Sequence, residues 1–142
     1  MNMIQSAKDQ VLALTTAAYQ KASAAGLLPE GVTVTPSVEI PKDTANGDYT
    51  TTFCLAAAKA MKMNPRQVAQ ILTEQMDLTD TYFTSVELAG PGFLNFRLGS
   101  RWFGDTVACV EAEGADYGRN DTLTGKKYMV EFVSANPTGP MH

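Results

Sequence analysis

The feature that most constrains the fold is a pair of alternating segments joined by a tight turn. The second segment, residues 93–98, alternates apolar residues with a more polar set. The apolar positions are Leu94, Phe96 and Leu98, and the opposite face carries Phe93, Asn95 and Arg97. The first segment, residues 82–88, places Tyr82, Thr84, Val86 and Leu88 on one face. The turn Ala89-Gly-Pro-Gly92 between them predicts a β-hairpin with one apolar side, which a second layer has to cover.

Helical periodicity predicts that second layer. Residues 3–25 repeat apolar side chains at helical spacing, at Ile4, Ala7, Val11, Leu14 and Ala18, and Gly26 follows as a stop. Further helices are expected over residues 51–63, from the cap Asn64-Pro65 onward, and from Ser100 to near Gly114. Residues 32–40, interrupted by Pro36, predict an edge strand. The expected fold class is α+β, a two-layer domain with helices packed on a small antiparallel sheet.

Composition excludes several classes of function. No apolar run approaches the ~20 residues that a membrane-spanning helix needs, so no membrane partner is expected. The single histidine is His142, which argues against an internal zinc site, and we expect no metal site in the chain. Cys54 and Cys109 lie in helical patterns without metal-ligand spacing and are predicted to be free core thiols in a reducing compartment.

The net charge of −4 limits how the chain could bind nucleic acid. A protein that binds mainly by neutralising phosphates is normally basic. Any RNA contact is therefore expected to use a small shaped patch and to add little affinity by itself. DNA is not an expected partner.

Composition changes after residue 114. Residues 115–126 are crowded with Gly, Asn and Asp and keep no hydrophobic period, which predicts a linker. Residues 128–133, Tyr-Met-Val-Glu-Phe-Val, are almost continuously apolar, as is typical of a strand buried on both faces of a parallel sheet. Such a strand cannot stand alone, so we expect its partners to lie beyond residue 142. The expected units are 1–114, 115–126 and 127–142.

The segment after this strand has residue types that suit a ligand site. Ligands of α/β enzymes bind at the carboxyl ends of parallel strands. Gly139 and the prolines around it fix a tight backbone path, and Ser134 and Asn136 add hydrogen-bonding side chains. Glu131 places a carboxylate on an otherwise apolar strand, where it would need a cationic partner. The residues alone leave a second interpretation open, in which Asn-Pro-Thr-Gly-Pro is only a strand-to-helix turn.

Residues 130–142, Val-Glu-Phe-Val-Ser-Ala-Asn-Pro-Thr-Gly-Pro-Met-His, closely resemble the stretch of arginyl-tRNA synthetases that enters the nucleotide-binding "HIGH" signature of their class I catalytic domain. Met141 replaces the usual leucine. Three upstream segments are similar to the same family's amino-terminal domain, in the same order: Ile40-Pro-Lys-Asp, Gly47-Asp-Tyr and Ala89-Gly-Pro-Gly-Phe-Leu-Asn-Phe. One departure is Thr52, where the family pattern has asparagine.

The resemblance implies that residues 127–142 are the first strand and the start of the nucleotide signature of a Rossmann-like catalytic domain. The complete enzyme would attach arginine to its tRNA in the cytoplasm, with ATP as a substrate and Mg²⁺ accompanying it, and this segment alone would be inactive. Glu131 would pair with the cationic end of arginine, while Ser134 and Asn136 would orient the amino acid. The nucleotide pocket would be formed by Pro137, Thr138, Gly139, Pro140 and His142. His142 would also act in catalysis, by stabilising charge on the transferring phosphate.

The resemblance also implies a role for residues 1–114, because the family's extra module contacts the D-loop at the outer corner of the tRNA. Phe93 would stack on an unpaired base, Asn95 would read its edge, and Arg97 would contact a phosphate. In the alternative, Phe93 packs against a helix and Arg97 is solvated. Asp43, Asp48 and Tyr49 are interpreted as turn and cap residues, and Lys126 and Lys127 as a solvated linker end. A different class of function remains open, namely a non-catalytic RNA-binding or interaction module.

Overall fold

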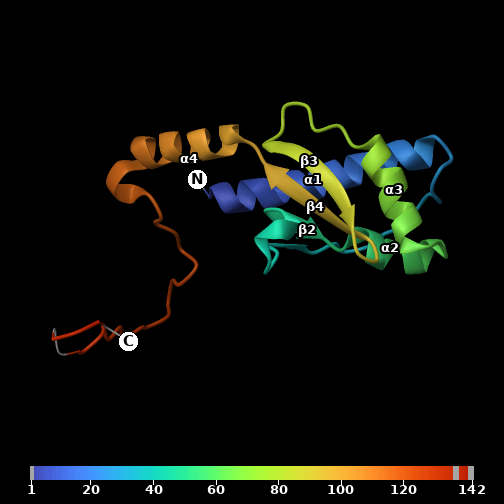
Figure 1. Cartoon of the computed structure of the whole chain (residues 1–142). Coiled ribbons are helices and arrows are strands. Elements are labelled where there is room, and N and C mark those ends of the chain that lie inside the picture. Colours follow the sequence, from blue (N-terminus) through green and yellow to red (C-terminus); the bar gives the residue numbers. More distant parts are fainter. Residues whose placement is uncertain (1, 136–137, 141–142) are drawn as a thin grey trace.

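The computed structural model describes residues 2–135 and 138–140, in which helices pack on one face of an antiparallel sheet (Figure 1). The helices are α1 (Met3–Ala24), α2 (Phe53–Met61), α3 (Pro65–Gln75) and α4 (Ser100–Glu113), with short 3-10 turns η1 (Thr44–Asn46) and η2 (Gly114–Asp116). The strands are β1 (Val38–Glu39), β2 (Tyr49–Thr51), β3 (Phe83–Ala89) and β4 (Phe93–Leu98). The predicted two-layer α+β fold with a small antiparallel sheet is confirmed.

The sheet has the order β1-β2-β4-β3, so the hairpin strand β4 is central and β2 pairs with it from a distant part of the sequence. All three strand pairs are antiparallel. Thr50 lies opposite Asn95, and Asn95 lies opposite Glu87 on the other side. Paired residues share a face, so these three side chains lie in one row on the face that the helices leave open.

The core forms between the covered face of the sheet and helices α1, α2 and α3. Its largest fully buried apolar side chains include Phe96, Leu94, Leu72, Val11 and Val68. Phe83 packs edge-on against Phe96, with ring centroids 5.3 Å apart. Burial of each such side chain stabilises the fold by about 1.5–3 kcal/mol, so the predicted apolar side of the hairpin is what fixes the sheet on the helices.

A β-bulge changes the predicted face of β3. The pairing shifts register between Phe83 and Ser85. Phe83 is therefore buried in the core and Thr84 is exposed, whereas the expected alternation placed Thr84 on the apolar face. An extra residue in one strand reverses which face the side chains before it point to. The predicted apolar face is therefore correct only for Val86 and Leu88, which lie after the bulge.

Two other boundaries differ from the expectation. The helix expected over residues 51–63 is preceded by the short strand β2 and begins only at Phe53. The edge strand around Pro36 is confirmed at the edge of the sheet, but it is limited to Val38–Glu39. Thr52, the departure from the family pattern, shares a hydrogen bond of 2.8 Å with the Ser37 hydroxyl.

Helix α4 projects from the domain and is anchored through its first turns. All of α4 lies in the described part of the chain, and none of its residues is buried. The Trp102 indole packs against the core and donates to the Met3 carbonyl at 3.1 Å. The aligned apolar residues Phe103, Val107 and Val110 are exposed.

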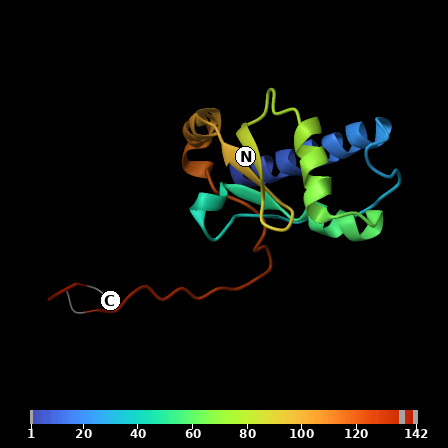
Figure 2. The same cartoon turned by 45° about the vertical axis from the view of Figure 1, so that its right-hand side comes forward.

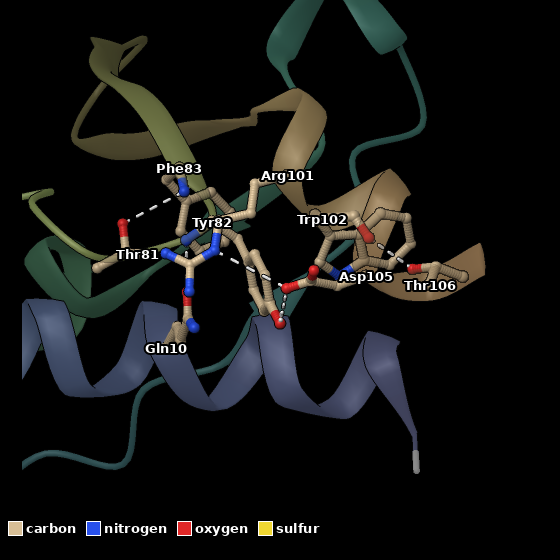
Figure 3. A network of polar contacts seen from close by, with 8 residues as sticks. All are labelled: Gln10, Thr81, Tyr82, Phe83, Arg101, Trp102, Asp105 and Thr106. Atoms are coloured by element: carbon tan, nitrogen blue, oxygen red, sulfur yellow. Dashed lines mark hydrogen bonds and ion pairs between the residues drawn. The ribbon is translucent and has the colours of Figure 1, made fainter. Parts of the chain in front are cut away.

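A polar cluster joins α4 to α1 through Tyr82, the residue just before β3 (Figure 3). The Tyr82 hydroxyl donates to Asp105 at 3.0 Å, and the Arg101 guanidinium lies 5.7 Å from the Tyr82 ring centroid. The Tyr82 backbone N–H donates to the Gln10 side chain at 2.9 Å. Burial and the hydrogen bond to Asp105 raise the pKa of the Tyr82 phenol, while the charge of Arg101 opposes this shift.

The prediction that both cysteines lie in the core is correct for Cys54 and wrong for Cys109. Cys54 is fully buried in the core, but Cys109 is only partly buried because it lies on the projecting helix α4. Both cysteines lie in the described part of the chain, and neither forms a disulfide. Among the described residues, no helix is long and apolar enough to cross a membrane.

The segment predicted to form a buried parallel strand is extended and exposed in this structure. Residues 127–135 are described and belong to no helix or strand. Met129 is 98% exposed and Phe132 is 84% exposed. Figure 2 shows this part of the chain leaving the domain. This exposure agrees with the expectation that the strand needs partners beyond residue 142, and its place in a Rossmann-like sheet stays a prediction.

Candidate functional site

A pocket of about 370 Å³ lies on the open face of the sheet, between the loop that contains η1 and the β3–β4 turn. The loop contributes Lys42 and Asn46, and the turn contributes Pro91. The strands contribute Thr50 and, from β4, Phe93 and Asn95. The pocket therefore combines an apolar side at the turn with a polar side at the loop.

The β3–β4 turn rests directly on the start of α3. Gly92 has a φ of +148°, and a Cβ at this position would lie 2.8 Å from the Pro65 Cβ. This close approach requires glycine, because a side chain would collide with Pro65. The Arg66 guanidinium donates to the carbonyl of Gly90, which also lines the pocket. The Asn64 side chain caps α3 by accepting from the Arg66 N–H at 2.9 Å.

Polar contacts attach the loop side of the pocket to β4. The Asp43 carboxylate accepts from the Ala45 N–H at 2.9 Å and so caps η1. The Asp48 carboxylate accepts from the Leu98 N–H at 2.8 Å. The Arg97 guanidinium donates to the Ala45 carbonyl at 2.7 Å. These contacts fix the loop against the strand that carries Asn95.

The cap interpretation of Asp43 agrees with its bond, whereas the Asp48 carboxylate joins the loop to the end of β4 and caps no turn. Tyr49 has a different role from both, because its ring is buried in the core and packs edge-on against Phe83. Burial, followed by the nearby charge of Asp48, raises the pKa of the Tyr49 phenol. Gly47 lets the chain pass close to β4, since a Cβ there would lie 2.8 Å from the Phe96 carbonyl oxygen.

The centre of the pocket has polar groups that are nearly buried. Asn95 is 7% exposed and lines the pocket from the central strand. Its cross-strand neighbour Thr50 also lines the pocket, and the Thr50 hydroxyl oxygen is buried with no hydrogen-bond partner among the described residues. A buried polar atom without a partner costs about 1–3 kcal/mol, so this site favours a ligand with polar edges.

The structure brings together two of the three residues predicted to contact tRNA. Phe93 and Asn95 line the same pocket, while Arg97 bonds to Ala45 and is not among its described lining residues. Thr50 and Asn46 were missed by sequence reasoning. Their position depends on the pairing of β2 with β4, and a three-residue strand leaves no periodic signal.

The residues predicted for arginine and ATP binding are not assembled into a site among the described residues. Glu131 and Ser134 are exposed, and so are Thr138, Gly139 and Pro140. Asn136, Pro137 and His142 lie outside the described residues, so their predicted roles have no structural counterpart here. The described residues contain no group of three or more His, Cys, Asp or Glu side chains that could hold a metal ion.

Known proteins similar to this chain agree on one assignment. An arginine–tRNA ligase from Acetivibrio thermocellus is 43% identical over 141 residues, which cover 99% of this chain and 25% of that protein. An arginine–tRNA ligase from Caldanaerobacter subterraneus is 41% identical with the same coverage of both chains. This chain spans about a quarter of the length of these two relatives.

One solved structure, a Thermus thermophilus arginyl-tRNA synthetase, is 29% identical with a TM-score of 0.45, covering 63% of this chain and 14% of that chain. The family described as "Arginyl tRNA synthetase N terminal domain" matches residues 9–98, which include the sheet, helices α2 and α3, and the whole pocket. Because this match covers more than half of the sequence, the chain belongs to the family of arginyl-tRNA synthetase N-terminal domains.

Proposed function

We propose that this chain is the amino-terminal part of an arginine–tRNA ligase and that its pocket binds an unpaired base of the tRNA D-loop. The observation that carries the proposal is the joint placement of Phe93 and Asn95 in one pocket of about 370 Å³. Proteins that read RNA sequence usually bind splayed-out bases, which stack on aromatic rings and form hydrogen bonds through their edges.

Each side of the pocket has a part in this function. Phe93 offers its ring to the base, and stacking of a base on an aromatic ring is worth about 1–3 kcal/mol. Asn95 offers an amide that can donate and accept hydrogen bonds at the base edge. The Thr50 hydroxyl, buried beside Asn95, supplies a second polar group. Arg97 fixes the loop side through Ala45, and its contact with a phosphate remains part of the proposal.

The remaining roles concern the longer enzyme. Residues 1–114 act as the tRNA-recognition domain, 115–126 as a linker, and 127–142 as the first strand of a Rossmann-like catalytic domain. The parent protein attaches arginine to its tRNA in the cytoplasm and consumes ATP. Glu131, Ser134 and Asn136 bind arginine, and residues 137–140 with His142 bind ATP. Mg²⁺ accompanies the ATP of the longer enzyme, and no residue of this chain is proposed as its ligand.

Binding by this chain alone should be weak. The net charge of −4 opposes the approach of an RNA backbone, so affinity depends on the pocket. Titration of labelled arginine tRNA with the chain, followed by fluorescence anisotropy, tests this account. Phe93→Ala should weaken binding about 5–150-fold, the equivalent of about 1–3 kcal/mol. Exposed Phe103 on α4 provides the matched control, and Phe103→Ala should leave binding unchanged.

The same binding assay also distinguishes D-loop recognition from general RNA binding. Replacement of the unpaired D-loop nucleotides by a short closed linker should reduce binding as much as Phe93→Ala does. Binding that is insensitive to both changes would refute the D-loop proposal. Equal binding of unrelated tRNAs and unstructured RNA would favour a general RNA-binding or interaction module.

A further inference from the structure

The pocket needs a cation at its rim if it binds a nucleotide within an RNA chain. A base that enters a pocket leaves its ribose and flanking phosphates at the entrance. The acidic residues of this surface do not suit such phosphates: Glu39 and Glu87 lie in the same cross-strand row as Thr50 and Asn95, and Asp43 lines the pocket itself. A positive side chain must therefore offset them at a defined position.

Two basic residues other than Arg97 lie close to the pocket, and they differ in how firmly they are placed. Lys42 lines the loop side and carries a flexible side chain. Arg66 is exposed at the start of α3, and its guanidinium bonds to the carbonyl of Gly90 on the turn side. That bond uses one of the five N–H donors of arginine and leaves the others available for an oxyanion.

We infer that Arg66 contacts a phosphate of the nucleotide whose base occupies the pocket, an inference that rests on the function proposed above. The Gly90 carbonyl holds the guanidinium at the turn, next to the segment that carries Phe93. An arginine that is already oriented loses less side-chain entropy when it binds phosphate. The start of α3 has no acidic residue in its first turn, so no neighbouring carboxylate of that turn competes for the guanidinium.

Arg97 is less suited to this position than Arg66. It lies two residues beyond Asn95 on β4, about 7 Å further from the turn. Its guanidinium bonds to the Ala45 carbonyl on the loop side of the site. Arg66 thus places a cation beside the aromatic stacking surface, whereas Arg97 stabilises the loop.

Salt dependence distinguishes a phosphate contact from a structural role. The affinity for arginine tRNA should be measured between 50 and 200 mM KCl for the wild type and for Arg66→Gln. Loss of one phosphate contact should reduce the slope of log K against log salt by about 0.7–0.9. The affinity lost through Arg66→Gln should then be about three times greater at 50 mM than at 200 mM.

Lys21→Gln is a control with the same change in charge. Lys21 is exposed on α1. Hydrogen bonds with Thr79 lower the pKa of Asp77 most, and the charge of Lys21 lowers it further. Lys21 therefore lies near Asp77, which follows the end of α3 that is far from Arg66. The length of α3 separates the two sites by about 15 Å. Arg66→Lys keeps the charge and should retain most of the slope.

Three results would overturn the inference. If Arg66→Gln weakens binding equally at every salt concentration, the residue supports only the turn. If its slope matches that of Lys21→Gln, Arg66 contributes only to net charge. Should wild-type binding depend on neither Phe93 nor the D-loop, the proposed function fails and this inference fails with it. The first two results leave the proposed function intact, so the failures are distinguishable.

Discussion

Replacement of Gly92 by alanine tests whether close contact between the β3–β4 turn and α3 forms one side of the pocket. A Cβ at Gly92 would lie 2.8 Å from the Pro65 Cβ and 3.2 Å from the Pro65 carbonyl carbon and oxygen. Gly90, in the same turn, also has a positive φ, of +52°, but the nearest atom to its Cβ would be a Phe93 ring carbon at 3.6 Å. Alanine at either position would strain the backbone, but only alanine at Gly92 would also collide with Pro65.

The magnitudes follow from these two terms. At Gly90, left-handed alanine costs about 1–2 kcal/mol, and reduced freedom of the unfolded chain offsets about 0.4–1 kcal/mol. At Gly92, an unusual positive φ costs about 1–3 kcal/mol, and overpacking against Pro65 adds about 1–3 kcal/mol. We therefore expect Gly92→Ala to lower the free energy of unfolding by about 2–5 kcal/mol and Gly90→Ala by about 1 kcal/mol.

Urea unfolding followed by the fluorescence of Trp102 measures both effects, because this indole is partly buried against the core. Gly92→Ala should also weaken tRNA binding under conditions where the variant is folded, since relief of the collision moves the turn that lines the pocket. Equal losses of stability in the two variants would refute the reasoning, because the contact with Pro65 would then contribute nothing.

Three further predictions concern the stability of the fold. Asp48→Ala removes the acceptor for the Leu98 N–H and should lower the free energy of unfolding by about 1–2 kcal/mol, with a smaller loss for Asp48→Asn, as measured by urea unfolding. Burial raises the pKa of the Cys54 thiol to about 12, so the fold favours the neutral thiol. This stability is fully present below the unfolded pKa near 8.5 and is lost as pH rises toward 12, at most by about 1.4 kcal/mol per pH unit. Unfolding curves between pH 8 and 10 should show this decline in the wild type and lack it in Cys54→Ala; parallel curves would contradict it. Val107→Ser should change the free energy of unfolding by less than about 0.5 kcal/mol, and a clearly larger loss would mean that the exposed side of α4 is packed in solution.

The two-layer arrangement of helices on a sheet was predictable from the sequence, because the apolar residues of the long helix and of the hairpin strand recur at clear helical and strand spacing. The 22 residues of α1 and the apolar alternation of β4 each bury one face, and both faces meet in the core. The bulge in β3 was not predictable, since a register shift at Phe83 depends on how β3 pairs with β4 and not on the order of side chains.

The candidate site was predictable only in part, for a related reason. Phe93 and Asn95 lie two residues apart on one strand, so alternation places them on one face. Thr50 and Lys42 join them only through the pairing of β2 with β4, which connects segments about 45 residues apart in sequence. Exposure of the apolar segment 128–133 has a simpler cause, because strand formation there requires neighbouring strands.

Footprinting of arginine tRNA by this 142-residue chain tests the central claim most directly. Chemical probing of the RNA at saturating protein should show protection confined to unpaired nucleotides of the D-loop. The protection should disappear with Phe93→Ala and persist with the surface control Phe103→Ala. Protection at the anticodon or acceptor end without any at the D-loop, or a footprint that Phe93→Ala leaves unchanged, would contradict the account.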